Sequence, residues 1–282
     1  MISNSHLYRT LIKKEESSFN LVAFYSLRKL SGYSGSAIRV RRSSDNSEQD
    51  IGFIGSVLDT TSLLSFVGSN NGYVTKWYEQ TGLGNDLFNT STTEQPLIVS
   101  SGVLNTSGGQ ECVYFDGVDD RLVEVSPYID FTTNGQFSVF SVFEPKVINP
   151  GTNHVLIHVD RFTPRVSQIF RISGSKPQMI SFNTTGNSFT NTNNTTLSIN
   201  TKYVSSSIRR QNDIEIYLNG SSILPTTTTG TARNKTTILE IGRRLTSEAF
   251  NGNAFEFKIY NGDLDNTSKQ NVENEIISYY GI

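Results

Sequence analysis

The stretch Trp77-Tyr78-Glu79-Gln80-Thr81-Gly82-Leu83-Gly84-Asn85-Asp86-Leu87 joins an aromatic run to a polar loop that contains two glycines. Glycine adopts positive φ angles that other residues resist, so this pattern is typical of a strand that ends in a tight loop. The side chains of Trp77, Tyr78, Asn85 and Asp86 are candidates for ligand binding. A core position for the two aromatic residues is the simpler interpretation.

Downstream of this stretch, the sequence predicts one strand after another. Each predicted strand is short, rich in Val, Ile, Phe or Tyr, and bounded by turn-forming residues. The predicted strands are Leu97–Ser100, Cys112–Phe115, Leu122–Val125, Gln136–Phe143, Val155–Val159, Gln168–Ile172, Gln178–Phe182, Tyr203–Ile208, Ile214–Leu218, Ile238–Ile241 and Ala254–Tyr260. So many strands without helical patterns between them indicate an antiparallel sandwich of two sheets. The Asn- and Thr-rich tract Asn187–Thr196 is expected to be an exposed loop.

Two helices interrupt the β pattern. Asp59–Gly68 has an Asp or Thr cap, apolar residues at helical spacing and a terminal glycine, which predicts a helix of two turns. Near the end of the sequence, Thr267-Ser268-Lys269-Gln270 resembles a capping box. The apolar residues that follow it at helical spacing are Val272, Ile276, Tyr279 and Tyr280. We expect this second helix to pack its aromatic stripe on the sandwich.

Composition limits the function classes. The 282 residues are 35% hydrophobic and 11% aromatic, which is enough to fill a core. A net charge of -2 gives no electrostatic case for nucleic acid or an anionic membrane as a partner. The single cysteine, Cys112, excludes an intrachain disulfide, and with only three histidines it argues against a structural zinc site.

Residues 1–20 form a polar arm that is either frayed or docked on a neighbouring subunit, and residues 21–282 form a single sandwich domain. The arm carries Arg9, Lys13 and Lys14 among short apolar pairs and lacks the apolar core of a signal peptide. No run of the sequence reaches membrane-spanning length. We therefore expect a protein that is made in a cytoplasm without a secretion signal.

One acidic loop is a weak calcium candidate. Asp45, Glu48 and Asp50 offer carboxylate oxygens within a short segment. The segment lacks the fixed spacing and the glycine of known calcium loops, so a solvated turn is the simpler interpretation. No other cofactor is expected.

Three signatures, in chain order, resemble laminin-G-like, concanavalin A-like sandwiches. They are Val113–Leu122, Ile214–Gly220, and Ile238–Gly242 followed by Phe250–Tyr260. In the first third, Tyr25–Leu30, Ile38–Asp45 and especially Trp77–Asn85 resemble the catalytic domain of fungal and bacterial α-L-arabinofuranosidase B. The same combination is similar to that of uncharacterised bacteriophage virion proteins. The resemblance implies an all-β, concanavalin A-like (jelly-roll) sandwich with a short internal helix and a C-terminal helix.

The residues that would carry catalysis in that family are replaced in this sequence. Retaining glycoside hydrolysis needs two carboxylates about 5 Å apart. The resemblance places the nucleophilic glutamate just after Gln178–Phe182, where the chain continues Asn183-Thr184-Thr185. It places the acid/base aspartate just after Ile238–Gly242, where Arg243 and Arg244 stand. Neutral amides and hydroxyls cannot form the glycosyl intermediate, and an arginine is no general acid at neutral pH.

A shifted alignment does not restore the catalytic pair. A slip of a few residues brings Glu248 into the place of the acid, but no Asp or Glu lies between Arg161 and Gln211 to act as nucleophile. His154 and His158 lie on a strand, and a metal site there lacks an identifiable third ligand.

The sequence therefore predicts a non-catalytic structural protein of a bacteriophage virion, placed on the capsid or in the tail and receptor-binding apparatus. Its expected partners are other virion subunits, including copies of itself, and a glycan on the host surface. Asp116, Asp119 and Asp120 join the loop residues named above as candidates for glycan binding, although acidic residues in tight turns often bind only backbone amides. The alternatives are an active glycoside hydrolase of arabinofuranosidase type and a purely structural assembly subunit.

Overall fold

Apolar runs rich in β-branched and aromatic residues form strands along nearly the whole chain. The computed structural model describes residues 20–124, 135–149, 151–159, 168–182, 187–222, 226–227, 238–244 and 248–282. The elements of the first half are β1 (Asn20–Ser26), β2 (Ile38–Arg42), β3 (Glu48–Ile51), β4 (Phe53–Ile54), β5 (Val57–Leu58), α2 (Thr60–Val67), β6 (Gly72–Trp77), β7 (Leu87–Phe88), β8 (Leu97–Ser100), β9 (Val103–Leu104), β10 (Thr106–Ser107), β11 (Gln110–Glu111), β12 (Val113–Asp116) and β13 (Leu122–Glu124).

The second half continues in the same way. Its elements are β14 (Phe137–Pro145), β15 (Asn153–Val159), β16 (Gln168–Ser173), β17 (Lys176–Phe182), β18 (Ser188–Thr192), β19 (Tyr203–Arg209), β20 (Asp213–Leu218), β21 (Ser221–Ser222), β22 (Thr226–Thr227), β23 (Leu239–Ile241), β24 (Asn251–Asn261) and α3 (Asn266–Tyr280). Each strand after Pro96 that the sequence predicts is therefore present, with ends that differ by a few residues. The tract Asn187–Thr196 is a correction, because β18 lies within it.

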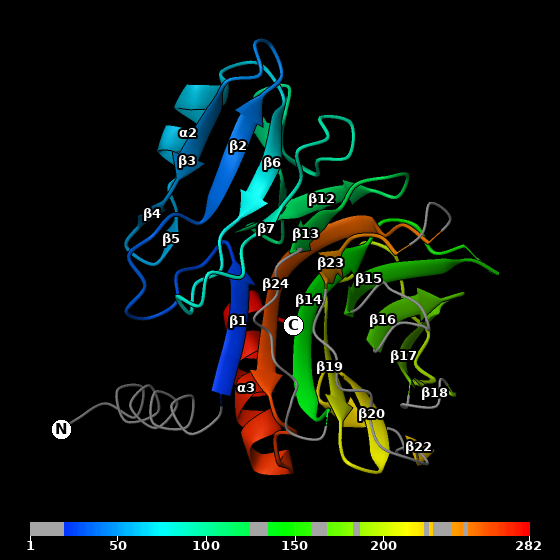
Figure 1. Ribbon diagram of the computed structural model, residues 1–282. Coiled ribbons are helices and arrows are strands. Elements are labelled where there is room, and N and C mark those ends of the chain that lie inside the picture. The colour runs from blue at the N-terminus through cyan, green and yellow to red at the C-terminus, as the bar shows by residue number, and fades with distance from the viewer. Residues whose placement is uncertain are drawn as a thin grey trace.

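The strands form two layers. In the first layer, β24 pairs with β1 and β12 on one side and with β14 on the other, and β19 and β20 follow β14. In the second layer, β18, β17, β16, β15, β23 and β13 pair in that order. Figure 1 shows the two layers facing each other, with β2, β3, β6 and α2 forming a lobe at one end. The hydrogen-bonded sheet is nearly closed, and the predicted jelly-roll sandwich is confirmed.

Aromatic side chains fill the space between the layers. The rings of Trp77 and Phe257 meet edge to face with centroids 6.0 Å apart. Phe143 contacts Phe250 in the same way at 6.4 Å. Such pairs combine large apolar burial with favourable ring geometry. The Trp77–Phe257 pair joins the first third of the chain to β24, and the Phe143–Phe250 pair joins β14 to the residue just before β24.

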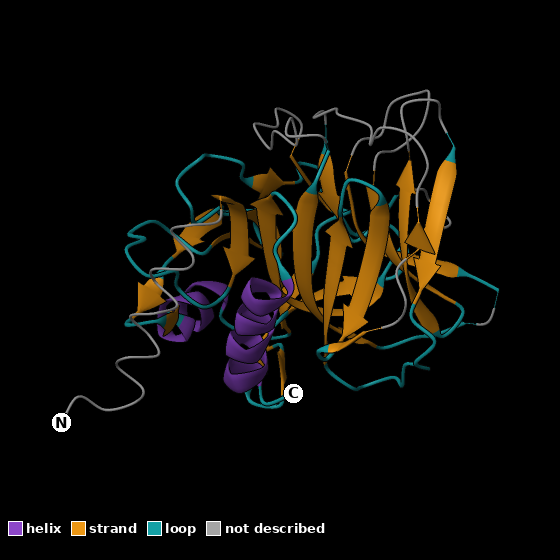
Figure 2. Cartoon of the chain, turned by 90° about the horizontal axis from the view of Figure 1, so that it is seen from below, coloured by secondary structure: helices purple, strands orange, loops and turns teal. Residues whose placement is uncertain are grey.

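Both predicted helices are present. The carboxylate of Asp59 accepts a hydrogen bond from the Ser62 amide at 2.9 Å and caps α2, which ends at Gly68 with a φ of 61°. The predicted capping box at Thr267 is wrong, because Asp265 caps α3 by accepting from the amide of Ser268. Figure 2 shows α3 against the outside of the sheet, where its side chains pack with those of β14, β19 and β24.

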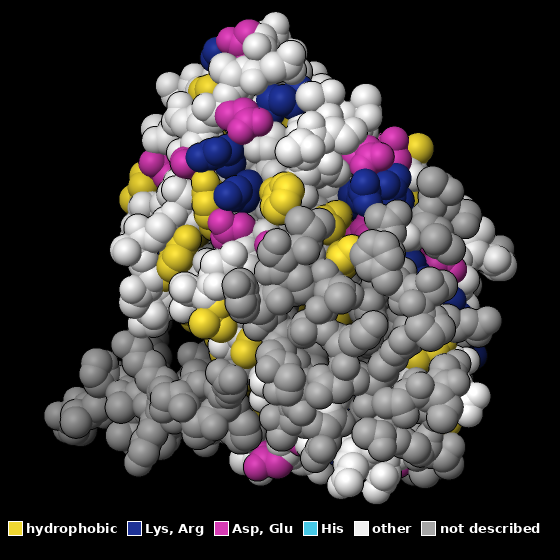
Figure 3. All heavy atoms as spheres, in the orientation of Figure 1, with side chains coloured by type: hydrophobic (Ala, Val, Ile, Leu, Met, Phe, Trp, Pro, Cys, Tyr) yellow, Lys and Arg dark blue, Asp and Glu magenta, His cyan; other side chains and the backbone are white. Residues whose placement is uncertain are grey.

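Among the described residues, no helix is long and apolar enough to cross a membrane. The predicted arm, residues 1–20, lies outside the described residues except for Asn20, at which β1 begins. On the face seen in Figure 3, acidic and basic side chains lie interspersed in small groups, as expected for a chain of net charge -2.

Candidate functional site

The loop after β6 is held by its own acidic residue. The Glu79 carboxylate is 3% exposed and accepts hydrogen bonds from the amides of Phe24 at 3.2 Å and Leu83 at 3.0 Å, and also from Thr81. The first of these amides belongs to β1. A buried carboxylate is stable when backbone donors satisfy it, so Glu79 fixes the loop and ties it to the first strand.

The neighbouring polar side chains also bond to groups of the protein itself. Gln80 accepts from the Leu30 amide at 2.7 Å and donates to the Ser26 carbonyl at 2.8 Å. The Asn85 amide donates to the Val22 carbonyl at 3.3 Å. Asp86 accepts from the Glu79 amide at 2.9 Å and pairs with Lys76 at 3.3 Å. The polar groups of this stretch are therefore largely engaged with the protein itself.

The two aromatic candidates differ in exposure. Trp77 is fully buried, and its ring packs on the core, so it offers no exposed platform for a sugar. Tyr78 is half-buried and donates from its hydroxyl to Asp50 at 2.8 Å. Burial and then the Asp50 carboxylate raise the pKa of Tyr78 above its ordinary value. Of the four candidates in this stretch, Tyr78 and Asp86 present part of their surface to solvent.

The calcium candidates do not gather around one point. Asp45 pairs with Arg42 at 2.6 Å, and Asp50 pairs with Arg39 at 2.7 Å, while Glu48 lies on the exposed part of β3. Within the described ranges, one group of at least three Asp, Glu, His or Cys residues has its ligand atoms within 4.8 Å of one another. That group contains none of the three calcium candidates. The solvated-turn interpretation fits Asp45, which accepts from the Ser47 amide.

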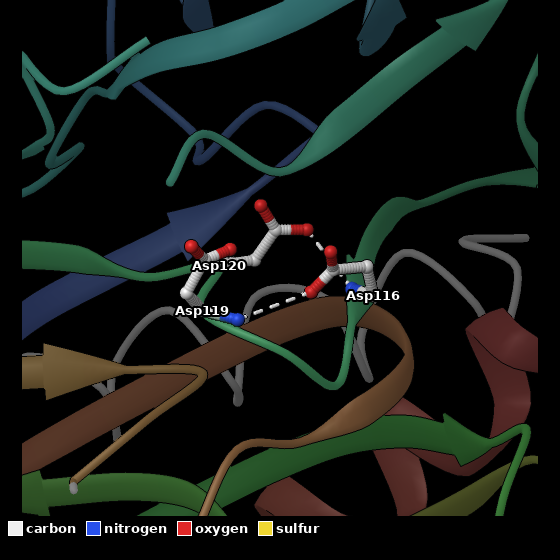
Figure 4. A group of neighbouring side chains, drawn as sticks. All are labelled: Asp116, Asp119 and Asp120. Atoms are coloured by element: carbon white, nitrogen blue, oxygen red, sulfur yellow. Dashed lines mark hydrogen bonds between the residues drawn. The ribbon is translucent and has the colours of Figure 1, made fainter. Parts of the chain in front are cut away.

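That group is Asp116, Asp119 and Asp120, in the turn between β12 and β13 (Figure 4). Asp116 accepts from the amides of Val118 at 2.8 Å and Asp119 at 3.4 Å, as turn carboxylates commonly do. Asp120 accepts from the Asp116 amide at 2.9 Å. The structure thus brings three of the predicted site residues together.

Asp120 differs from its two neighbours in burial, since only 6% of it is exposed. Burial raises the pKa of this carboxyl to about 7, and the nearby charges of Asp116 and Asp119 act in the same direction. The Asp116 amide and the charge of Arg243 oppose the rise only in part. Asp120 therefore changes its protonation state close to neutral pH.

A polar network next to this turn was not predicted. Arg121 donates to Glu94 at 2.8 Å and reaches Glu240 at 3.5 Å, and Arg243 lies 3.4 Å from the same Glu94 oxygen. His158 contacts the other oxygen of Glu240 at 3.1 Å. We call Glu94, Arg121, His158, Glu240 and Arg243 the sheet-face network.

The network lies on the face of the second layer that points away from the core. His158 stands between the core residues Ile157 and Val159, and Glu240 stands between Leu239 and Ile241. Side chains alternate along a strand, so both polar groups point to the opposite face. A polar residue in the middle of each apolar strand was the available sequence signal. His154 does not join them, because its ring contacts Thr152 and the Ala249 carbonyl.

The carboxylates on this face are paired with basic side chains. Burial alone would raise the pKa of Glu94, but the hydrogen bond from Arg121 and the charges of Arg121 and Arg243 outweigh it and hold the pKa below its ordinary value. Glu248, which a shifted alignment brings into the place of the acid, pairs with Arg244 at 3.0 Å and lies 3.9 Å from Arg171. The segment Asn183-Thr184-Thr185 lies outside the described residues.

The fold defines the class of protein as a jelly-roll sandwich. No protein-family model matches the chain, and no curated protein matches it. Among solved structures, an arabinofuranosidase complexed with arabinofuranosyl-α-1,2-xylobiose is similar, with a TM-score of 0.69 and 15% identity over 94% of this chain and 64% of that chain. This chain thus spans 64% of the length of that arabinofuranosidase, and the likeness shows the fold alone.

Two other solved structures show how widely the fold occurs. The binding domain of Paraclostridial Mosquitocidal Protein 1 is similar, with a TM-score of 0.55 and 10% identity over 86% of this chain and 52% of that chain. Domain 4 of AbnA, an extracellular GH43 arabinanase from Geobacillus stearothermophilus solved in complex with arabinotriose, has a TM-score of 0.50 and 12% identity over 89% of this chain and 96% of that chain. The arabinofuranosidase-like architecture predicted from the sequence is confirmed at the level of fold.

Proposed function

We propose that the chain is a carbohydrate-binding sandwich that does not hydrolyse its ligand. The observation that carries the proposal is the replacement of the expected acid by Arg243 and Arg244, both of which are ion-paired. The likeness in fold to an arabinofuranosidase and to an arabinanase domain solved with arabinotriose supports carbohydrate as the ligand class. In this region Glu94, Arg121, Asp116 and Asp119 are part-exposed and offer charged donors and acceptors of the kind with which proteins bind sugar hydroxyls.

The test measures binding and hydrolysis in parallel. The purified chain is run in native gels that contain arabinan, arabinoxylan or no polysaccharide, and the same polysaccharides are incubated with it and assayed for reducing sugar. We expect slower migration with at least one polysaccharide and no release of sugar. Unchanged migration in every gel rejects carbohydrate binding for these polymers, whereas released sugar rejects the non-catalytic part.

One observation favours the alternative of an active hydrolase. Asp120 has a pKa of about 7, which suits a general acid, and its oxygens lie within 4.8 Å of those of Asp116 and Asp119. However, the two carboxylates of a glycosidase must flank the scissile bond. Three acids in one short turn all approach a sugar from the same side. Sugar release that is lost in Asp120→Asn would establish this alternative.

The virion role belongs to the same proposal and rests on the sequence resemblance to bacteriophage virion proteins. In this role the chain decorates the capsid or tail, assembles with other virion subunits and presents its sugar-binding face to the host surface. Purified phage particles that carry the chain, detected by mass spectrometry, would support the role. A chain found only free in the lysate would contradict it, and particle assembly without any glycan binding would favour the purely structural alternative.

A further inference from the structure

A lysine, a side-chain amide and a buried carboxylate meet at the end of β14. Lys146, the residue after this strand, donates from Nζ to Oδ1 of Asn200 at 3.0 Å and also to the carboxylate of Glu144. Glu144 is 2% exposed, whereas Asn200 lies at the surface. An amine, an amide carbon and a group that carries protons are the components needed to make a new amide bond.

Backbone hydrogen bonds hold the amine and the amide next to each other. The Asn200 amide donates to the Pro145 carbonyl at 2.8 Å, and the Lys146 amide donates to the Asn251 carbonyl of β24 at 2.9 Å. Asn200 has a φ of 56°, a left-handed conformation that asparagine adopts more readily than most residues. Because both segments are fixed in this way, the two reacting groups stay close without a further loss of entropy.

The carboxylate of Glu144 is placed to take the proton that a charged lysine must lose before it can attack. It accepts hydrogen bonds from Lys146, from Ser107 and, at 3.2 Å, from Asn253. Burial would raise the pKa of Glu144, but the hydrogen bonds from Lys146 and Ser107 and the charge of Lys146 outweigh it and hold the pKa below its ordinary value. Glu144 is therefore ionised at neutral pH and able to act as a base.

We propose that Lys146 and Asn200 join in an intramolecular isopeptide bond, with Glu144 as the proton carrier. Glu144 accepts one proton from the Lys146 ammonium, and the neutral amine attacks Cγ of Asn200. Glu144 returns this proton to Nδ2, the Cγ–Nδ2 bond breaks and ammonia leaves to solvent. A second Lys146 proton passes through Glu144 to the ammonia. The products are an amide, an ammonium ion and the regenerated carboxylate, so the step needs no oxidant or reductant.

The bond ties together parts of the sandwich that are distant in sequence. It closes the segment from Lys146 to Asn200, which contains β15, β16, β17 and β18, into a covalent loop. It also fastens the end of β14 to the turn before β19, the strand that pairs with β14. A crosslink lowers the entropy of the unfolded chain, so this bond stabilises the first layer.

Mass spectrometry of the purified full-length chain tests the proposal. We expect the wild type to be lighter than its sequence mass by one ammonia. A proteolytic digest should contain a branched peptide that joins Lys146 to Asn200. Lys146→Arg keeps a cation beside Glu144 but should have its full mass. Asn200→Gly should have its full mass too, because glycine keeps the backbone conformation and removes the amide. Thermal unfolding confirms that the variants are folded.

The role of Glu144 is tested separately. Glu144→Gln keeps the amine and the amide but removes the proton carrier, so we expect the variant to remain unlinked. The chain also offers a matched control contact, because Lys176 donates to Oδ1 of Asn194 at 3.4 Å. Within the described part of the chain, no carboxylate forms an ion pair with Lys176. The digest should therefore show Lys176 and Asn194 in separate peptides.

The branched peptide decides the outcome, because ring closure at an Asn-Gly step such as Asn219-Gly220 also releases ammonia. A wild type of full mass overturns the proposal, and so does ammonia loss without the branched peptide. A branch between Lys146 and Asn253 overturns the assignment of Asn200. A bond that still forms in Glu144→Gln, or one between Lys176 and Asn194, overturns the role of Glu144.

Discussion

At the scale of single residues, the polar side chains of the Trp77–Leu87 stretch serve the fold. Glu79 satisfies backbone amides of its own loop and of β1, and Gln80 spans two backbone groups near Leu30. Backbone donors buried without partners cost free energy, so these side chains replace the hydrogen bonds that a regular strand would have supplied. The distinctive sequence of the stretch is thus explained by how the first third attaches to the sandwich.

Glu79→Ala should lower the free energy of unfolding by about 1 to 3 kcal/mol, because it leaves the amides of Phe24, Thr81 and Leu83 without their acceptor. Glu79→Gln, which keeps one acceptor oxygen, should cost less. Urea unfolding measures both. Glu48→Ala is the control, since Glu48 is exposed on β3. A loss in Glu79→Ala no larger than in the control would show that the loop does not depend on this carboxylate.

At the scale of secondary structure elements, α3 is joined to the sheet by buried charges as well as by its aromatic stripe. Arg28, just after β1, donates to Glu256 of β24 at 2.6 Å and also contacts Glu275 of α3. Lys258 of β24 lies 2.7 Å from Glu275. Burial would raise the pKa of Glu275, but the charges of Lys258 and Arg28 outweigh it and hold the pKa at about 2. Glu275 therefore stays ionised across the physiological pH range.

Glu256→Gln should destabilise the protein by about 3 to 5 kcal/mol, because the change leaves Arg28 and Lys258 buried with one carboxylate fewer. Asp50→Asn is the matched control. It breaks an arginine–carboxylate pair of which both side chains are 40% exposed, and such pairs contribute about 0 to 1 kcal/mol. Thermal unfolding of both variants gives the comparison. Similar melting temperatures would mean that solvent reaches the Arg28–Glu256 pair.

At the scale of the whole molecule, stability should depend on pH through Asp120. The pKa of Asp120 is about 7 in the folded state, and its ordinary value is 3.8. Between these two pH values the folded state holds a proton that the unfolded chain has released. Stability from this group therefore rises as pH falls from about 7 to about 4. At pH 8 the Asp120 carboxyl of the wild type is ionised, and burial of this charge lowers the free energy of unfolding.

Asp120→Asn removes that cost. We expect the variant to be more stable than the wild type by about 2 to 4 kcal/mol at pH 8, with the difference disappearing near pH 4. Urea unfolding at several pH values measures it. Parallel curves for the two proteins between pH 4 and pH 8 would show that Asp120 ionises as freely in the fold as in the unfolded chain.

The strands and helices were predictable because their patterns are local. A run such as Phe137–Phe143 or the spacing in Asp59–Gly68 needs no partner to be recognised. The strand β18 was missed because its Asn191 is buried through a hydrogen bond from its amide to the Ile214 carbonyl, and composition alone suggests a loop. The cap of α3 was misplaced by two residues because Asp265 and Thr267 are both good capping types.

The candidate site was only partly predictable. The grouping of Asp116, Asp119 and Asp120 follows from their closeness in the chain. The sheet-face network joins Glu94, Arg121, His158 and Glu240 across long sequence separations, and its members meet only once strand pairing sets the register. The local sequence pattern does not show which residues of distant strands become neighbours in the sheet.

The position of β24 has a consequence for how the chain acquires its structure. This late segment is hydrogen-bonded to β1, β12 and β14, so most of the first layer has no continuous sheet until it arrives. During synthesis, the earlier strands leave the ribosome before their central neighbour exists. Pairing over such long separations is slow, and exposed strand edges in the meantime favour aggregation. We therefore expect the first layer to complete its sheet only after β24 has been synthesised.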